Sequence, residues 1–291
     1  MLDAALLSSI RDLEFVARVT VDGALAGLHR SPFHGYSAEF SQYRHYRPGD
    51  DLKYVDWKLF ARTDRVYTKQ FRETTNLRMQ LVLDASASMA FGEPRVSKME
   101  YARQLAAALA HLVVSQGDAA GLTVYDAALR TYVGPRPGRS HLRHLLTALS
   151  RVDAAGRTRS AQAIRAAVDL LENRGAVVCL SDLYDDEGAV DAELHRAARI
   201  GHDVTVFHVL APEDLEWRWG GDVEVEDSET GQRVLTSAAA AGAYAGRAAA
   251  FVQQWRERCL AYGADYVLAR TDQPPAQTLR AFLLQRQDVS R

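Results

Sequence analysis

The sequence predicts an α/β fold in which helices cover both faces of a mainly parallel sheet. From residue 77 onward, short apolar runs of strand length alternate with longer segments of helical periodicity. Such alternation is typical of parallel strands joined by crossover helices. The composition fits a folded globular chain, because 47% of the 291 residues are hydrophobic and 25% are charged. We therefore expect one α/β domain over residues 77–291.

The first 76 residues have a different pattern. Apolar residues recur at helical spacing over residues 5–29 without an internal proline, which predicts an amphipathic helix within an N-terminal segment of residues 1–30. Aromatic and charged residues alternate over residues 31–76, which predicts a small strand-rich extension. Within it, residues 43–65 are most simply interpreted as a twisted hairpin whose Asp and Arg side chains pair internally.

The α/β domain is predicted to contain its strands and helices in alternation. The predicted strands span residues 77–84, 119–126, 128–134, 176–182, 203–210 and 264–269. The predicted helices span residues 98–116, 139–150, 159–173 and 189–199, with a final helix from residue 278. Period-two alternation on both sides of a Ser-Glu-Thr-Gly turn predicts an inserted hairpin near residues 222–236, before a long Ala-rich helix.

Charge and missing motifs disfavour several classes of function. The chain has 35 Lys and Arg against 37 Asp and Glu, so it lacks the basic bias that is typical of nucleic-acid binding. Its two cysteines, Cys179 and Cys259, are expected to be reduced thiols. No leader pattern and no run of about 18 apolar residues is found, so we expect a cytoplasmic protein without direct membrane insertion. The GxSxG, Walker-type, GxGxxG and HExxH motifs are also absent from the sequence.

The sharpest candidate site is a DxSxS motif formed by Asp84, Ser86 and Ser88, which begins where a predicted strand ends. Ligands of open parallel sheets gather beyond the carboxyl ends of the strands. Alternate residues of an extended loop face the same way, so this motif offers a carboxylate and two hydroxyls, the hard oxygen ligands of Mg²⁺ or Mn²⁺. Taken alone, the motif has a simpler explanation as a helix cap or an Asx turn.

Two further residues are expected at the same edge of the sheet. Asp182 ends a predicted strand as Asp84 does, and Thr158 precedes the helix predicted from residue 159. Together with the DxSxS motif they would form a cage of oxygen ligands. With at most two carboxylates the ion is incompletely neutralised, so a carboxylate from another molecule can complete its shell. Such a site binds a partner through the metal and needs no nucleophile.

An enzymatic alternative starts from the same aspartate. In a metal-dependent phosphohydrolase that forms an aspartyl phosphate, Asp84 would be the nucleophile, and Lys98 or Arg103 would hold the phosphate. That chemistry usually has a second acid two residues later, where this chain has Ser86. Lys98 and Arg103 fit a solvated helix face equally well, so this alternative has less support than the binding site.

A second concentrated signal lies in the strand-rich extension. Arg, Tyr and Trp residues are frequent between residues 43 and 65, and these residue types are enriched in interaction hot spots. A third hypothesis is therefore a scaffold protein. Its metal site would be empty, and its strand-rich extension would contact the partner. The candidate partner-binding residues are Arg47, Asp50, Asp51, Asp56, Trp57 and Arg62.

These motifs together resemble a known family. The runs SPFHGYSAEFSQYRHYRPGDDLKYVDWKLFARTDRVYTKQF and LVLDASASM, with GDD, DW and DxSxS in this order, resemble the bacterial domain of unknown function 58 family. Members of that family carry a von Willebrand factor A-like domain. The resemblance extends from about Leu13 to the C-terminus. It implies a Rossmann-like α/β sandwich of von Willebrand factor A type with a metal-ion-dependent adhesion site.

The resemblance also implies ligands and partners. The family ligands carry over to Asp84, Ser86 and Ser88 for the DxSxS motif, to Thr158 for the threonine and to Asp182 for the last aspartate. Family members usually associate with MoxR-type AAA+ ATPases, which are chaperone-like remodelling machines. We therefore expect a non-enzymatic adaptor that binds such an ATPase or its client protein through Mg²⁺.

Overall fold

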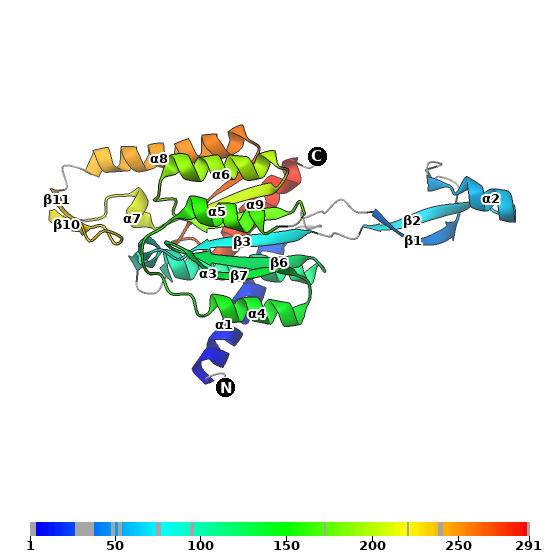
Figure 1. Cartoon of the computed structure of the whole chain (residues 1–291), viewed down its shortest axis with the longest axis horizontal. Helices are drawn as coiled ribbons and strands as arrows, with labels where there is room; N and C mark the ends of the chain where they lie inside the picture. Colours follow the sequence, from blue (N-terminus) through cyan, green and yellow to red (C-terminus); the bar gives the residue numbers. More distant parts are fainter. Residues whose placement is uncertain are drawn as a thin grey trace. The chain divides into compact units, whose positions relative to one another are not determined.

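The structure is a computed structural model that describes residues 4–26, 38–47, 50–51, 54–73, 77–93, 96–171, 173–219, 221–237 and 241–289. The chain divides into two compact units (Figure 1). The larger unit comprises residues 1–32 and 77–291, and the smaller comprises residues 33–76. The larger unit contains the central sheet, and the smaller unit has a two-stranded sheet of its own.

The larger unit is built on a six-stranded sheet with the strand order β12-β9-β8-β3-β6-β7. Neighbouring strands are parallel except for β6 and β7, which are antiparallel. The strands are β3 (Arg78–Asp84), β6 (Ala119–Tyr125), β7 (Leu129–Arg136), β8 (Ala176–Ser181), β9 (Asp203–Leu210) and β12 (Asp265–Arg270). Strand β8 is buried along its whole length, as expected for a strand covered on both faces.

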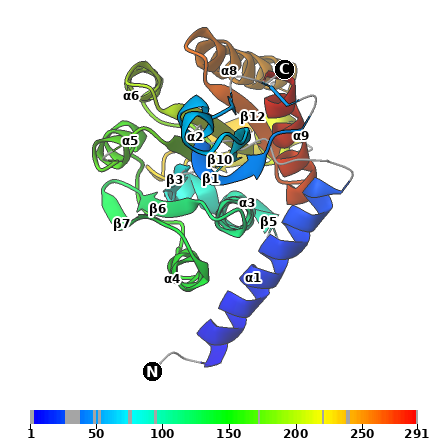
Figure 2. The ribbon, with the colours of Figure 1, turned by 90° about the vertical axis from the view of Figure 1, so that its right-hand side faces the viewer.

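Helices cover both faces of this sheet. Figure 2 shows α5, α6 and α8 on one face and α3, α4 and α9 on the other. The helices are α3 (Lys98–Ser115), α4 (Arg139–Leu149), α5 (Ser160–Asp169), α6 (Glu187–Arg199), α8 (Ala241–Ala261) and α9 (Pro275–Val289). The predicted α/β sandwich, a mainly parallel sheet with helices on both faces, is therefore confirmed.

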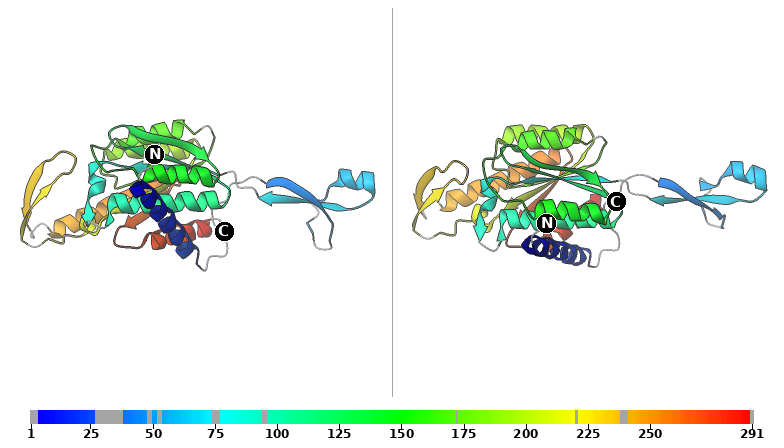
Figure 3. Two further views of the ribbon diagram at one scale, coloured as in Figure 1. Left: turned by 90° about the horizontal axis from the view of Figure 1, so that it is seen from below. Right: turned by 60° about the horizontal axis from the view of Figure 1, so that its bottom comes forward.

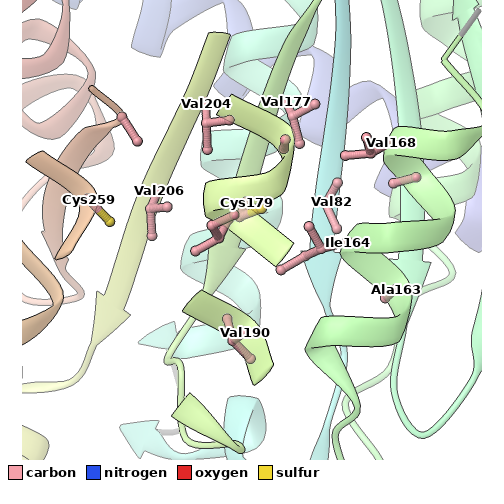
Figure 4. Close-up of a cluster of buried hydrophobic side chains, with 14 of the residues drawn as sticks. Val82, Ala163, Ile164, Val168, Val177, Cys179, Val190, Val204, Val206 and Cys259 are labelled. Carbon is pink, nitrogen blue, oxygen red and sulfur yellow. The ribbon is translucent and has the colours of Figure 1, made fainter. Parts of the chain in front are cut away.

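The core beneath α5, α6 and α8 joins strands that are distant in sequence. Val82 of β3, Cys179 of β8 and Val206 of β9 lie beside one another and meet Ile164 of α5 (Figure 4). These side chains are at most 2% exposed, and each such apolar side chain contributes about 1.5–3 kcal/mol of burial free energy. This packing holds β3, β8 and β9 side by side. It therefore also sets the positions of the residues that follow these strands.

Both cysteines are free and buried. Burial raises the pKa of the Cys179 thiol to about 12 and that of the Cys259 thiol to about 11. Thiols with such pKa values carry little thiolate at neutral pH and react slowly.

The N-terminal helix α1 (Ala4–Leu25) lies across α3, as Figure 3 shows, and also contacts α9. Its buried side chains recur at intervals of three or four residues, which is the spacing of one helix face. They are Ile10, Leu13, Ala17, Val21 and Ala24. The helix was expected over residues 5–29, of which residues 27–29 lie outside the described part of the chain.

The smaller unit pairs β1 (Ala38–His45) with β2 (Tyr67–Glu73) in an antiparallel sheet. The prediction of a hairpin over residues 43–65 is wrong, because helix α2 (Trp57–Thr63) occupies its second half. The reason is local: Asp56 Oδ1 accepts hydrogen bonds from the backbone N–H groups of Lys58 and Leu59 at 3.0 and 2.9 Å, which caps the start of a helix.

Several short elements were not predicted. They are the 3₁₀ helix η2 (Ala87–Ala90), the strands β4 (Gly92–Glu93) and β5 (Val96–Ser97), and helix α7 (Pro212–Leu215). The inserted hairpin is present as β10 (Asp222–Glu226) and β11 (Arg233–Ser237), and it lies near the end of the sheet at which β3 terminates (Figure 1). None of the helices among the described residues is long and apolar enough to cross a membrane.

Candidate metal centre

Asp84 is the last residue of β3, and its side chain points into a polar, buried end of the sheet. One carboxylate oxygen, Oδ1, accepts a hydrogen bond from the backbone N–H of Ser86 at 2.9 Å, which is the Asx turn expected for this motif. The other oxygen, Oδ2, accepts a hydrogen bond from Ser181 Oγ at 2.7 Å and lies 3.5 Å from Thr158 Oγ1. An Asx turn thus accounts for Oδ1 of Asp84. It does not account for Oδ2, which faces hydroxyl groups.

The two serines of the DxSxS motif lie next to each other, with 3.1 Å between Ser86 Oγ and Ser88 Oγ. Their loop is tied to the loop that carries Thr158, because the backbone N–H of Ala87 donates to the carbonyl of Gly156 at 2.8 Å. The structure therefore brings four of the five predicted ligands into one oxygen-rich cluster.

Asp182, the fifth predicted ligand, follows β8 beside β3, and its carboxylate has a different partner. Lys98 Nζ donates to Asp182 Oδ2 at 2.7 Å and lies 3.3 Å from Asp214 Oδ2. The same ammonium lies over the rings of Phe91 and Tyr184, 5.5 and 5.2 Å from their centroids. The sequence left a solvated helix face open as one interpretation of Lys98, and this interpretation is wrong, since the residue is 1% exposed.

The charge of Lys98 is set by two opposing effects. Burial alone would lower the pKa of its ammonium group, but the carboxylates of Asp182 and Asp214 outweigh burial and raise the pKa. Lys98 is therefore a buried cation that is already shared between two carboxylates. Arg103, the other suggested phosphate holder, instead donates to Glu100 and to the carbonyl of Val152.

Asp84 lacks such a cation. Burial, together with repulsion from Asp182, raises the pKa of Asp84 to about 7. Among the residues that the structure describes, no Lys, Arg or His forms an ion pair with Asp84. A buried carboxylate of this kind is stabilised by a bound cation.

The donor set fits magnesium better than zinc. The side chains around Asp84 offer carboxylate and hydroxyl oxygens, which Mg²⁺ prefers, and no sulfur or imidazole nitrogen. In the described part of the chain, no three His, Cys, Asp or Glu side chains form a group that could hold a metal. Hydroxyl groups would therefore have to supply much of the coordination, as the DxSxS prediction requires.

Several residues of the site were missed from the sequence. Ser181 bonds Asp84 directly, and its place at the end of β8 beside Asp182 was a usable signal. Ser160 Oγ lies 3.1 Å from Thr158 Oγ1, and the Ser160 backbone N–H donates to Asp185 Oδ2 at 2.6 Å. Asp185 thus accepts a hydrogen bond from the first residue of α5.

The candidate partner-binding residues of the smaller unit divide into two groups. Asp50 pairs with Arg44 at 2.7 Å, and Asp56 accepts a hydrogen bond from Tyr43 at 2.8 Å, so these two aspartates stabilise the unit itself. The internal Asp–Arg pairing expected for this stretch is thus present for Asp50. The exposed candidates are Arg47, Asp51, Trp57 and Arg62.

Comparison with known proteins agrees with the resemblance seen in the motifs. Residues 42–252 match the family model described as "Protein of unknown function DUF58". The chain belongs to this family. It is 32% identical over 234 residues to uncharacterized proteins from Mycobacterium bovis and Mycobacterium tuberculosis, which covers 79% of this chain and 73% of each relative. It is also 30% identical over 128 residues to the uncharacterized protein YeaD from Bacillus subtilis, which covers 43% of this chain and 30% of that relative.

Solved structures with a similar fold share little sequence with this DUF58 member. An aerotolerance-related membrane protein from Bacteroides fragilis is 18% identical, with a TM-score of 0.49 over 73% of this chain and 99% of that chain. The SpRpn10 VWA domain is 13% identical, with a TM-score of 0.41 over 69% of this chain and 92% of that chain. The architecture of this chain rests on its own sheet order, described above.

Proposed function

We propose that this DUF58 protein is a non-enzymatic adaptor that holds Mg²⁺ at the carboxyl end of β3 and uses the ion to bind an acidic side chain of a protein partner. The observation that carries the proposal is the Asp84 cluster, in which a buried carboxylate without a cationic partner among the described residues faces hydroxyl groups from two other segments. When bound, the ion would supply positive charge and an open coordination position.

The residues of the cluster have separate tasks in this proposal. Asp84 supplies the charge that attracts the cation, and Ser86, Ser88 and Thr158 supply neutral oxygen ligands. Asp182 lowers the local potential further, while Lys98 holds its carboxylate in one orientation at 2.7 Å. With so little negative charge on the ligands, the cation keeps a high affinity for a further carboxylate.

The phosphohydrolase alternative has weaker support. Lys98 and Arg103 are both engaged by the chain's own oxygens and are not free to hold a phosphate. The residue two positions after Asp84 is Ser86, which is a poor general acid. A screen with generic phosphate esters decides between the two: turnover that is lost in Asp84→Asn supports the enzyme, and inactivity supports the adaptor.

The partner in this proposal is a MoxR-type AAA+ ATPase or its client protein. The support is the family to which the chain belongs, whose members usually accompany such ATPases. Because an ATPase of this type depends on cytoplasmic ATP, the proposal also implies that the adaptor works in the cytoplasm.

Binding of the purified, nucleotide-free MoxR-type ATPase of the same organism tests the partnership. We expect wild type to bind it in Mn²⁺ and to release it in EDTA, and Ser88→Ala to bind at least ten-fold more weakly. Ser140→Ala is a matched control, because Ser140 is an exposed serine of α4. Binding that survives Ser88→Ala but is lost in Trp57→Ala would instead support contact through the smaller unit.

A further inference from the structure

The inserted hairpin brings a carboxylate to the candidate metal centre. In its turn, Asp227 Oδ1 accepts hydrogen bonds from the backbone N–H groups of Glu229 and Thr230 at 2.8 and 3.1 Å, which fixes the backbone at Glu229. The side chain of Glu229 then reaches the loop before α5, where its Oε2 accepts a hydrogen bond from the backbone N–H of Thr158 at 3.1 Å. Glu229 is thus held by a residue whose own hydroxyl faces Asp84.

The second oxygen of this carboxylate needs an explanation. Glu229 Oε1 is shielded from solvent and has no hydrogen-bond partner among the described residues. A charged acceptor left in this state is costly. A cation bound beside Glu229 Oε1 would give this oxygen a partner.

We propose that Glu229 is itself a ligand of the Mg²⁺ held by Asp84, Ser86, Ser88 and Thr158, and that it occupies from within the chain the position taken by a partner's carboxylate. The inference rests on the proposed function of this site. It gives Glu229 Oε1 a partner, and it gives the cation a further carboxylate ligand from outside the five predicted residues.

The hairpin also covers a cavity of about 750 Å³. Its walls include Ser88 and Lys98 on the side of the metal centre and residues 223–230 of the hairpin on the other side. Strands β10 and β11 pair chiefly with each other, and Val234 and Leu235 of β11 are 55% and 76% exposed. Because Glu229 occupies the open position on the ion, an acidic side chain of a partner must displace it. The hairpin is then an internal competitor for the site.

Mn²⁺ is the probe that tests this ligand. Its affinity is measured by titration, and the water molecules that remain on the bound ion are counted by pulsed electron paramagnetic resonance in D₂O. We expect Glu229→Ala to bind Mn²⁺ about ten-fold more weakly than wild type, with one more water on the ion. Acetate, used as a small carboxylate, should displace a water from Glu229→Ala at lower concentration than from wild type.

Glu224→Ala is the matched control, because it removes an exposed carboxylate of the same hairpin. Equal affinity and equal water number in wild type and Glu229→Ala, with Mn²⁺ binding lost in Asp84→Asn, would overturn the role of Glu229 and leave the metal centre intact. Mn²⁺ binding that is also unchanged in Asp84→Asn would overturn the metal centre and, with it, the role of Glu229.

Discussion

Lys98 holds two buried carboxylates in place, and its charge therefore matters for stability. Its ammonium lies 2.7 Å from Asp182 and 3.3 Å from Asp214, and all three side chains are at most 10% exposed. Removing one partner of a buried ion pair leaves an uncompensated charge, which costs about 3–5 kcal/mol. We expect Lys98→Met to lose about that much free energy of unfolding, measured by urea denaturation.

The control for this variant is Arg199→Met, which removes an exposed cation at the end of α6. Exposed substitutions usually change stability by about 0.5 kcal/mol or less. Equal stability of Lys98→Met and Arg199→Met would show that the buried ammonium does not stabilise the fold.

The positions of predicted strand ends were enough to find part of the candidate metal centre. Asp84, Ser86 and Ser88 follow a strand directly, so their position was visible in the sequence, and Thr158 was visible as the residue before a helix. The contact between Lys98 and Asp182 was not visible in the sequence, because it depends on α3 starting beside β8, which no spacing reveals. Glu229 was not visible either, because it belongs to an insertion outside the alternating pattern of strands and helices.

At the scale of elements, helix α1 tests how the N-terminal segment is attached. Leu13 is 6% exposed on the face that meets the rest of the larger unit, whereas Phe15 on the same helix is 58% exposed. We expect Leu13→Ala to lower the free energy of unfolding by about 2–5 kcal/mol, because it leaves a cavity. Phe15→Ala should change it by about 0.5 kcal/mol or less. Chemical denaturation of the two variants checks this, and similar losses for both would contradict the observed packing.

Long periodic elements were predicted well because their patterns reflect burial. Strand β8 and helix α3 lie close to their predicted positions, since nearly every β8 residue and one broad face of α3 is apolar. Helix α2 was missed because its start depends on a single capping side chain, Asp56, within an aromatic stretch that resembles a strand. The short strands β4 and β5 have two residues each, too few to form a pattern.

At the scale of the whole molecule, buried histidines predict loss of stability in mild acid. Burial lowers the pKa of His202 below its ordinary value of 6.5, and its Nδ1 accepts a hydrogen bond from the Gly175 backbone N–H at 3.3 Å. The unfolded chain therefore binds this proton more readily than the folded chain as pH falls below 6.5. The contribution of His202 is fully present above that pH and decreases below it.

Urea denaturation between pH 7 and pH 5 measures this effect. We expect the free energy of unfolding of wild type to fall over this interval, and that of His202→Asn to fall less. His144→Asn is a control at an exposed position of α4. The same pH dependence in wild type and His202→Asn would contradict the role assigned to His202.

In the proposed metal centre, the buried Asp84 carboxylate at the end of β3 would hold the ion that binds the partner. Calorimetric titration of Mg²⁺ into wild type and into Asp84→Asn tests it most directly, with circular dichroism to show that both are folded. We predict saturable binding of one ion per chain in wild type and no binding in Asp84→Asn. Indistinguishable heats for the two proteins would contradict the account.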